Sequence, residues 1–445
     1  MNLEKLALGI PTILLPNAGI DLGHWAVIAC DQYTSEPEYW QAVDRLVADH
    51  PSTLRLIFPE VYLEEDDIDK RIDDINTCMD QYVADGVLVA QQPGFVLLDR
   101  QTSHVPSRKG LVVALDLEAY DYRPGSKTLI RATEGTIVDR LPPRIRVREN
   151  AAVELPHIMV LIDDPEMTVI EPLFAAELEQ VYDFELMQGS GHLRGWKVTE
   201  KPLLDRVGSA LGRLAEKDRF QKRYDVDDDE VMLYAMGDGN HSFATAKAIW
   251  ERLKSEAADS ADIMDHPARY ALVELVNLHD PGLEFEAIHR VLFDVDVEEL
   301  LNQADAYYRQ VGTPCRIEWC DDHDAAEAAA RVAGAAHAVP FVAAGIHGFL
   351  KIDDPALTLE VATLQNFLDE YLKNHSRARI DYIHGEEAVT RLGSLQGNIG
   401  FYLPSISKHD LFRTIVRDGA LPRKTFSMGE ADEKRFYLEA RRITR

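Results

Sequence analysis

The sequence predicts an α/β fold of mixed α+β character, with a mixed sheet and flanking helices. Strand-like and helix-like segments alternate along all 445 residues, and no internal repeat is visible. Hydrophobic residues make up 46% of the chain and charged residues 28%, proportions typical of a globular protein. Because helices and strands alternate, we expect the helices to pack against the faces of one sheet or more.

The first half of the chain predicts strands and helices in turn. The N-terminal stretch and the apolar run 25–30 predict strands, and Ser35 is expected to cap a helix with Pro37 in its first turn. A second helix is predicted over 66–84, where apolar side chains recur at helical spacing and Gly86 follows. Further strands are expected at 95–102, 110–122 and 157–163, the first two adjacent, and a further helix at 203–220.

The second half repeats this alternation. Strands are expected at 232–236, 268–278, 285–295, 341–352, 380–385 and 400–404, and helices from His241, at 325–336, at 359–372 and at 386–395. The acidic stretch 224–230 marks the expected division into an N-terminal region (1–225) and a C-terminal region (226–445), which together make one family unit. Its Asp227–Asp229 run is interpreted as a solvated loop, and no metal site built by the chain is expected.

Composition and charge exclude several classes of function. The formal net charge of −29 would repel a long phosphate backbone, so nucleic acid is not an expected partner. The four cysteines are scattered, which argues against a disulfide framework or a structural zinc site. No apolar run approaches the length of a membrane span, and no signal peptide is recognised. We therefore expect a cytoplasmic protein with a small-molecule ligand; the oligomeric state cannot be derived.

A glycine turn between a strand and a helix is the first candidate site. In YAMGDGNHSFATAKAIW (234–250), an apolar run ends at Gly237-Asp238-Gly239 and an amphipathic segment follows. The glycines allow backbone angles closed to other residues, and a helix N-terminus attracts anions. Neither the dinucleotide fingerprint nor the Walker loop fits. The residues alone leave open a phosphate site or a tight corner. Side chains that could add donors are Asn240, His241, Ser242 and Lys247.

An arginine-rich segment is the second candidate. RATEGTIVDRLPPRIRVR (131–148) carries five arginines against Glu134 and Asp139, a local excess of positive charge in an acidic chain. Arginine forks suit phosphate and carboxylate oxygens. Arg146 and Arg148 are expected to form surface salt bridges. Ligand contacts are expected instead from Arg131, Glu134, Arg140 and Arg144.

Three further stretches carry polar residues. CDQYTSE (30–36) follows a predicted buried strand, and such strand ends often carry chemistry. His279 and the pair His289-Arg290 lie on segments expected to neighbour the helix from His241. LPRKTFSMG (421–429) adds a second local positive charge, which includes Lys424. Each also has a purely structural interpretation: a turn and helix cap, core histidines, or a basic surface.

The order of these motifs resembles a known family. The motifs are ACD at 29–31, RATE to DR at 131–140, the Asp-Gly-x-His turn at 238–241, HR at 289–290, IDYIHG at 380–385 and LPRKTF at 421–426. On these residues the chain is identified as a member of the prokaryotic domain-of-unknown-function family numbered one thousand and fifteen. The Asp-Gly-His-His-Arg form usual at this turn is similar to the phosphate-binding turn of the ParB/sulfiredoxin-like fold, a group that includes free-serine kinases.

The resemblance implies a small-molecule phosphotransferase. Free-serine kinases phosphorylate a hydroxyl with ADP or ATP, so a magnesium nucleotide is the implied donor and a hydroxylated, serine-like metabolite the acceptor. In this chain Asn240 stands for the first His of the turn and Ser242 replaces the Arg. Two alternatives follow: either Arg140, Arg144 or Lys424 substitutes as the cation that neutralises the phosphate, or nucleotide binding is weakened or lost in this chain.

The expected roles follow from what phosphoryl transfer requires, namely positioning, charge neutralisation and a group that orients the hydroxyl. The expected catalytic residues are Asp31, Glu134 and His241. The expected phosphate contacts are Asp238, Gly239, Asn240, His241, Ser242, Arg140 and Arg144. The expected substrate contacts are Gln32, Tyr33, Thr34, Arg131, His289, Arg290 and Lys424. Two alternatives stay open: a non-catalytic nucleotide- or anion-binding regulator, and a ParB-like nucleic-acid protein, which the net charge disfavours.

Overall fold

The chain forms two compact units in a computed structural model that describes residues 3–63, 67–123, 125–136, 141–257, 260–334 and 336–445. Unit 1 comprises Met1–Glu284 and Met428–Arg445, and unit 2 comprises Phe285–Ser427. Unit 2 is therefore an insertion in the sequence of unit 1. The expected division at 224–230 falls inside unit 1, where this segment only joins a helix to the next strand.

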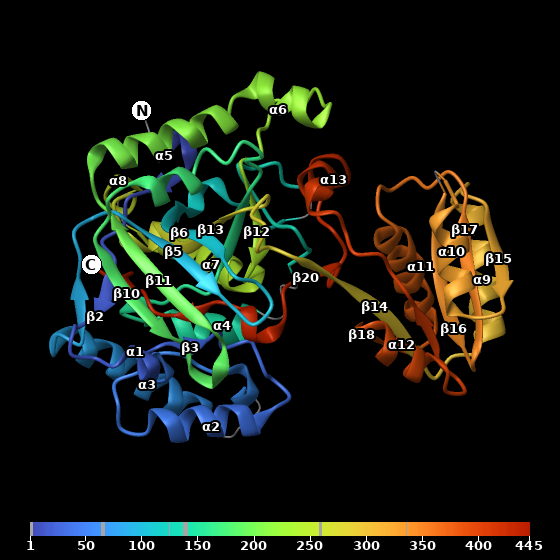
Figure 1. The fold of residues 1–445 in the computed structure, drawn as a ribbon, viewed down its shortest axis with the longest axis horizontal. Coiled ribbons are helices and arrows are strands. Elements are labelled where there is room, and N and C mark those ends of the chain that lie inside the picture. Colours follow the sequence, from blue (N-terminus) through green and yellow to red (C-terminus); the bar gives the residue numbers. More distant parts are fainter. Residues whose placement is uncertain (1–2, 64–66, 124, 137–140, 258–259, 335) are drawn as a thin grey trace. The chain divides into compact units, whose positions relative to one another are not determined.

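Nine strands within the described ranges of unit 1 form one mixed sheet (Figure 1). Their order is β10 (Gln180–Glu185), β11 (His192–Val198), β5 (Phe95–Gln101), β6 (Arg108–Asp116), β13 (Tyr270–Asn277), β9 (Met159–Ile162), β12 (Tyr234–Asp238) and β7 (Ile130–Arg131), with β1 (Leu8–Gly9) also paired to β6. β13 runs parallel to β9 and β12 parallel to β7, whereas the other pairs are antiparallel. This mixture confirms the predicted fold class.

Helices cover both faces of this sheet, because successive strand residues point to opposite sides. Leu111 and Val113 pack in one core with Leu211 and Phe243, whereas Val112 packs in the other core with helices of the N-terminal segment. The first core is covered by α5 (Lys201–Leu214) and α7 (Asn240–Glu256), and the second by α1 (Leu22–Trp25), α2 (Pro37–Val47) and α3 (Ile68–Ala84). Figure 1 shows α5 above the strands and α1, α2 and α3 below them.

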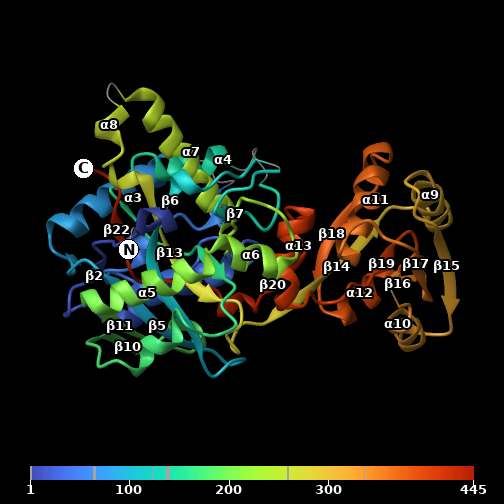
Figure 2. The same ribbon diagram turned by 90° about the horizontal axis from the view of Figure 1, so that it is seen from above.

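The remaining elements of unit 1 are short. α4 (Leu141–Arg148) packs beside α7, as Figure 2 shows. The other helices are α6 (Lys217–Tyr224), α8 (Ser260–Ile263), η1 (Leu3–Leu6), η2 (Thr53–Arg55), η3 (Glu60–Tyr62), η4 (Leu117–Ala119), η6 (Glu171–Ala175), η7 (Met187–Gly189), η8 (Pro267–Arg269) and η10 (Ala431–Glu433). Three two-stranded pairs join β2 (Leu14–Pro16) to β4 (Leu88–Ala90), β3 (Val27–Ile28) to β21 (Phe436–Tyr437), and β8 (Val153–Glu154) to β22 (Arg441–Arg442).

Unit 2 has its own sheet and its own core. The strand order is β15 (Cys315–Cys320), β17 (Ile346–Ile352), β16 (His337–Ala343), β19 (Ile399–Phe401), β14 (Phe285–Phe293) and β18 (Arg379–His384), with β20 (Phe426–Met428) also paired to β14. α9 (Val297–Gln310) and α11 (Glu360–Asn374) share a core with one face, and α12 (Glu386–Gly393) packs on the other. The unit also contains α10 (His323–Arg331), η9 (Lys408–Asp410) and α13 (Leu411–Asp418).

Most predicted elements are present, and the differences have local causes. The run 25–30 keeps only Val27–Ile28 as a strand, because Asp21 caps a short helix that ends at Trp25. Glu36 rather than Ser35 occupies the N-cap of α2, with Pro37 as its first residue. The helix predicted over 203–220 is two helices, α5 and α6. None of the helices in the described ranges is long and apolar enough to cross a membrane.

Candidate functional site

The strand-to-helix turn is built around Gly239. Gly239 has φ +80° and is the N-cap of α7, so the helix begins at Asn240, one residue before the start expected at His241. A Cβ on Gly239 would lie 3.0 Å from Cα of Ile158. A Cβ on Gly237 would lie 2.8 Å from Cε of Met428, so Gly237 is required for lack of space and not for a positive φ. The first N–H groups of an α-helix have no acceptor within the helix. The turn therefore brings the N–H groups of the first turn of α7 to the end of β12.

Lys434 provides a cation beside this turn. Its Nζ lies 3.2 Å from Oδ2 of Asp238 and donates to the carbonyl of Met428 at 3.1 Å. Burial would raise the pKa of Asp238, but the charge and hydrogen bond of Lys434 outweigh burial and hold this pKa below its usual value. Oδ1 of Asp238 accepts from the Gly239 N–H at 2.8 Å, which fixes the carboxylate against the turn. The sequence analysis did not single out Lys434, which lies far from the turn along the chain.

The segment that begins at Arg131 does reach the turn. β7 pairs in parallel with β12, so residues 132–136 leave the sheet at the same edge as Asp238. Nδ2 of Asn240 lies 3.5 Å from Oγ1 of Thr133. Oδ1 of Asn240 is buried and has no hydrogen-bond partner among the described residues. An amide in this position has an acceptor atom that remains available for a ligand donor.

A chain of hydrogen bonds connects Ser242, in the first turn of α7, to Cys30. Oγ of Ser242 lies 2.9 Å from Nε2 of His157, and Nδ1 of His157 lies 2.7 Å from the hydroxyl of Tyr437. The Tyr437 hydroxyl lies 3.2 Å from Sγ of Cys30. Either neutral tautomer of His157 fits this chain, and in one of them the ring proton lies on Nδ1. Nε2 of His157 is then an acceptor for a hydroxyl proton. This is the acceptor half of a general-base pair.

These four residues line one side of a cavity of about 130 Å³ in unit 1. Arg144 and Glu60 also line it and form an ion pair. Burial raises the pKa of Glu60, although the charge of Arg144 opposes the rise. Burial also raises the pKa of the Cys30 thiol above its usual range, with Asp31 and Glu60 adding to the effect. Cys30 is thus a neutral thiol in this environment rather than a reactive thiolate.

The polar residues after β3 lie beside this cavity. Asp31 follows Cys30, and its Oδ1 accepts from the side-chain amide of Gln32 at 3.0 Å. The ring of Tyr33 stacks on Tyr39 with centroids 3.8 Å apart, and Thr34 is exposed. Asp31 and Gln32 are thus bonded to each other and, unlike Cys30, are not among the residues that line the cavity, while Tyr33 is engaged in packing.

The arginines of the 131–148 segment have different environments. Arg131 is buried and donates to the carbonyl oxygens of Thr128 and Glu230 at 3.1 and 2.6 Å, which is a structural arrangement. Arg146 pairs with Asp69, as expected of a surface salt bridge, but Arg148 pairs with the buried Glu154 at 2.5 Å. Arg140 lies outside the described residues.

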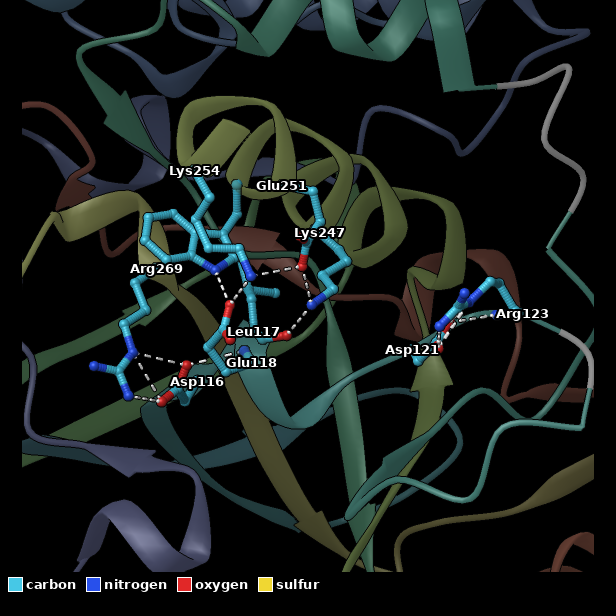
Figure 3. Close-up of polar contacts among 10 residues, drawn as sticks. Asp116, Leu117, Glu118, Asp121, Arg123, Lys247, Glu251, Lys254 and Arg269 are labelled. Atoms are coloured by element: carbon cyan, nitrogen blue, oxygen red, sulfur yellow. Dashed lines mark hydrogen bonds and ion pairs between the residues drawn. The ribbon is translucent and has the colours of Figure 1, made fainter. Parts of the chain in front are cut away.

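Several other predicted residues can now be placed. Glu134 is partly buried in the segment after β7, and His241 is partly buried in the first turn of α7. Lys247 is engaged away from the turn, because its Nζ donates to the carbonyl of Leu117 at 2.9 Å and pairs with Glu251 at 2.6 Å (Figure 3).

His279 lies at the sheet edge opposite the turn. β9 is antiparallel to β12, with Met159 facing Asp238, and it runs away from the turn to Asp163. At about 3.3 Å per residue, Asp163 is roughly 13 Å from Met159. Nε2 of His279 lies 2.6 Å from Oδ1 of Asp163. His279 itself therefore lies away from the start of α7, because the antiparallel pairing reverses the direction of the strand. The strand before it, β13, shares a core with α7, in agreement with the expectation that this segment neighbours the helix from His241.

His289, Arg290 and Lys424 belong to unit 2. Nδ1 of His289 accepts from the Leu403 N–H at 3.0 Å, and burial lowers its pKa to about 4. Arg290 is fully buried, donates to Gln365 at 2.9 Å and lies over the ring of Tyr382. Lys424 is exposed. Within unit 2, His289 and Arg290 therefore have structural partners of their own.

The comparison with protein families matches this chain over residues 14–382 to a family described as "Protein of unknown function (DUF1015)". The chain belongs to this family. No curated protein matches.

The solved structures that resemble this family member are distant. A free serine kinase mutant in complex with AMP is 9% identical, with a TM-score of 0.39, over 75% of this chain and 91% of the kinase. A conserved hypothetical protein from Pyrococcus furiosus is 13% identical, with a TM-score of 0.35, over 74% and 90%. A C-terminally truncated SbnI from Staphylococcus aureus is 9% identical, with a TM-score of 0.35, over 72% and 82%.

Proposed function

We propose that this protein is a small-molecule phosphotransferase that moves a phosphoryl group from ATP or ADP to a hydroxyl. The observation that carries the proposal is that Ser242 belongs to two features at once. Its backbone lies in the N-terminal turn of α7 behind Gly239, and its side chain lines the cavity beside His157. A phosphate on the turn and a hydroxylated acceptor in the cavity would then meet within one helical turn.

The charge of a bound phosphate has several candidate partners. Helix N-terminal N–H groups and a nearby cation are the usual phosphate donors. Lys434 lies beside the turn, and Arg144 lines the cavity that Ser242 also lines. Together with Arg140, these residues are the proposed replacements for the arginine whose position Ser242 occupies. Asp238, Gly239, Asn240 and His241 complete the proposed phosphate site.

The acceptor hydroxyl needs a group that takes or orients its proton. Nε2 of His157 lies 2.9 Å from the Ser242 hydroxyl, and with the ring proton on Nδ1 it could accept from an acceptor hydroxyl in the same place. We therefore add His157 to Asp31, Glu134 and His241 as a candidate base. Tyr437 would orient the imidazole through Nδ1. Phosphoryl transfer depends mostly on positioning and charge, so a single well-placed acceptor is sufficient.

Magnesium would be shared with the nucleotide. No group of three or more His, Cys, Asp or Glu side chains in the described ranges is arranged to hold a metal ion. Mg²⁺ in phosphotransferases is commonly held by one or two carboxylates together with substrate phosphates, and Asp238 or Glu134 could supply a carboxylate. The ion would neutralise phosphate charge.

The test is nucleotide turnover with matched variants. The protein is incubated with ATP or ADP, magnesium and a pool of hydroxylated metabolites, and nucleotide products are followed. His157→Gln should lower kcat by roughly 10²–10⁴-fold, the range for loss of a general base, with little change in nucleotide Kd. His241→Ala tests, in the same assay, the histidine that the sequence predicts to be catalytic. His192→Gln, on β11, is the control and should retain full activity.

Nucleotide binding is measured separately by calorimetry. Lys434→Met should weaken binding about tenfold, since a hydrogen bond to a charged group contributes roughly 1.5 kcal/mol. Lys201→Met, which removes an exposed pair with Asp205, is the control. Unchanged Kd in Lys434→Met would exclude Lys434 from the phosphate site.

A non-catalytic nucleotide- or anion-binding regulator is the second candidate. It is favoured by the pairing of the nearby cations, because Lys434 contacts Asp238 and Arg144 contacts Glu60. Such a protein would bind nucleotide without turnover in any metabolite pool. If no phosphate compound binds at all, both proposals fail.

A further inference from the structure

The cavity beside Ser242 is lined mainly by apolar side chains. Ile57, Met79, Val147, Leu155 and Leu272 are among its lining residues. A serine-like metabolite is polar at every atom beyond its short carbon skeleton. It would therefore offer little apolar surface to contact these side chains. Apolar walls with few polar groups are typical of sites for ligands with a hydrophobic body.

The polar groups of the cavity are connected to one another. Ser242, His157, Tyr437 and Cys30 form one hydrogen-bond chain. The backbone N–H of Glu60 donates to the carbonyl of Cys30 at 2.8 Å, which joins the Glu60–Arg144 pair to the same side. The cavity thus has a polar side, where a hydroxyl can bond to His157, and an apolar remainder.

The other charged residues of the lining satisfy each other. Glu154 is buried and pairs with Arg148 and Arg441 at 2.5 Å, and it also accepts from the Leu272 N–H at 2.9 Å. These charges therefore do not call for a second polar group on the ligand. A single polar head, placed at His157, is what the cavity can accommodate.

We infer that the acceptor is a hydroxylated molecule with an apolar body, rather than a serine-like polar metabolite. The role of this molecule as phosphoryl acceptor rests on the proposed phosphotransferase function, whereas its preferred binding to the cavity does not. An apolar cavity of about 150 Å³ is large enough for benzene, so the volume of about 130 Å³ here suits a short alkyl chain or a single ring. The hydroxyl bonds to Nε2 of His157, and the carbon body packs between α3, α4 and the strand residue Leu272.

The probe is a series of straight-chain 1,2-diols from propanediol to octanediol, titrated into the full-length protein by calorimetry without nucleotide. Diols are neutral, so a change in Kd along the series reports the apolar body alone. We expect affinity to rise about fourfold per added methylene, which corresponds to about 0.8 kcal/mol, until the cavity is filled. The heat-capacity change should become more negative along the series. L-Serine and glycerol should bind more weakly than hexanediol.

A variant that fills the cavity provides the second arm. Val147→Trp, on α4, should abolish the dependence on chain length, and Leu155→Phe is the alternative if the tryptophan variant does not fold. Val332→Trp is the matched control, because Val332 is 81% exposed in unit 2. His157→Gln should weaken every diol by a similar factor and leave the dependence on chain length intact.

The outcomes separate this inference from the proposed function. A flat series, or L-serine binding as tightly as hexanediol, would overturn the inference even if nucleotide is turned over with serine. Chain-length dependence that survives both filling variants would also overturn it, since the diols would then bind elsewhere. Chain-length dependence that these variants abolish, without nucleotide turnover in any pool, would retain the apolar site and reject the phosphotransferase.

Discussion

The interpretation of Ser242 depends on its neighbours in the structure. In the sequence it marks the loss of an arginine from a phosphate-binding turn, and the expected substitutes are basic residues. In the structure its hydroxyl contacts His157, which no sequence pattern singles out, and Lys434 lies beside Asp238. A single histidine before a strand and a single lysine near the C-terminus carry no spacing signal, so only their three-dimensional neighbours identify them.

His289 predicts a pH dependence for the stability of unit 2. Burial lowers its pKa to about 4 from the usual 6.5, with Arg290, His323 and His384 opposing protonation and Glu386 favouring it. Between pH 6.5 and pH 4, His289 is protonated in the unfolded chain but stays neutral in the folded state. The stabilisation is therefore complete above pH 6.5 and is lost as the pH falls towards 4, by roughly 3 kcal/mol at 1.36 kcal/mol per pKa unit.

Chemical denaturation between pH 7 and pH 4 measures this dependence. His289→Gln removes the titrating group, so its free energy of unfolding should change less steeply with pH than that of the wild type. Because the variant also alters the bond from the Leu403 N–H, the slopes are compared rather than the absolute values. Equal slopes for the two proteins would contradict the assignment.

At the scale of single elements, the start of α7 depends on Gly239. An alanine there would adopt a left-handed conformation, which costs about 1–2 kcal/mol, and its Cβ would also press on Ile158. Gly86→Ala is the matched control, since Gly86 has φ +69° and open space around it. Gly239→Ala should therefore lower the free energy of unfolding clearly more than Gly86→Ala.

The two alanine variants also separate folding from binding. Gly239→Ala should lose nucleotide binding, because the N-terminal turn of α7 would shift, and Gly86→Ala should retain it. Thermal unfolding and calorimetric titration of both proteins provide the comparison. Equal effects on stability would show that the contact with Ile158 relaxes at no cost.

The C-terminal part of α7 is attached by a different set of contacts. Around η4, Glu118 accepts from Nε1 of Trp250. Glu118 also accepts from Lys254, and Asp116 pairs with Arg269, as Figure 3 shows. Lys247 takes part by donating to the carbonyl of Leu117. Its role is thus to hold the helix rather than to bind phosphate.

Lys247→Met should therefore affect stability and leave ligand affinity unchanged. The loss of a largely buried, charge-assisted hydrogen bond should lower the free energy of unfolding by about 1–2 kcal/mol. Lys201→Met should cause no measurable change in unfolding. A nucleotide Kd weakened several-fold in Lys247→Met would contradict this view and return Lys247 to the phosphate site.

For the whole molecule, the insertion of unit 2 suggests a direct experiment. The chain leaves unit 1 at Glu284 and returns at Met428, and the Gly429 N–H donates to the Glu284 carbonyl at 3.3 Å. The two ends of the insertion are therefore adjacent in unit 1. A short Gly/Ser linker can join them without stretching the chain.

We expect unit 1, closed by such a linker, to fold cooperatively and to keep its nucleotide affinity, because the turn, the cavity and Lys434 all lie in it. Circular dichroism and calorimetric titration test the two expectations separately. A folded protein without nucleotide affinity would instead support the predicted roles of His289, Arg290 or Lys424, which lie in unit 2.

Local patterns predicted much of the fold. The helix over 66–84 was predicted from apolar side chains at helical spacing, and the two adjacent strands β5 and β6 from continuous apolar runs. The start of α7 was predicted from its glycine turn. The insertion of unit 2 was not predicted, because an insertion is defined by contacts between residues far apart in sequence and leaves no local signal in this chain.

By itself, the sequence determined the mixed α+β class, the family and the turn at Gly239. Periodicity and glycine geometry are local properties, and the order of motifs is read directly along the chain. Tertiary structure alone decided which residues meet. Because β9 is antiparallel to β12, His279 lies at the opposite end of the strands from the turn. Tyr437 lies in β21, which pairs with β3, and its hydroxyl contacts His157. Side-chain chemistry at a site depends on distances of a few ångströms, and only the packed chain sets those distances.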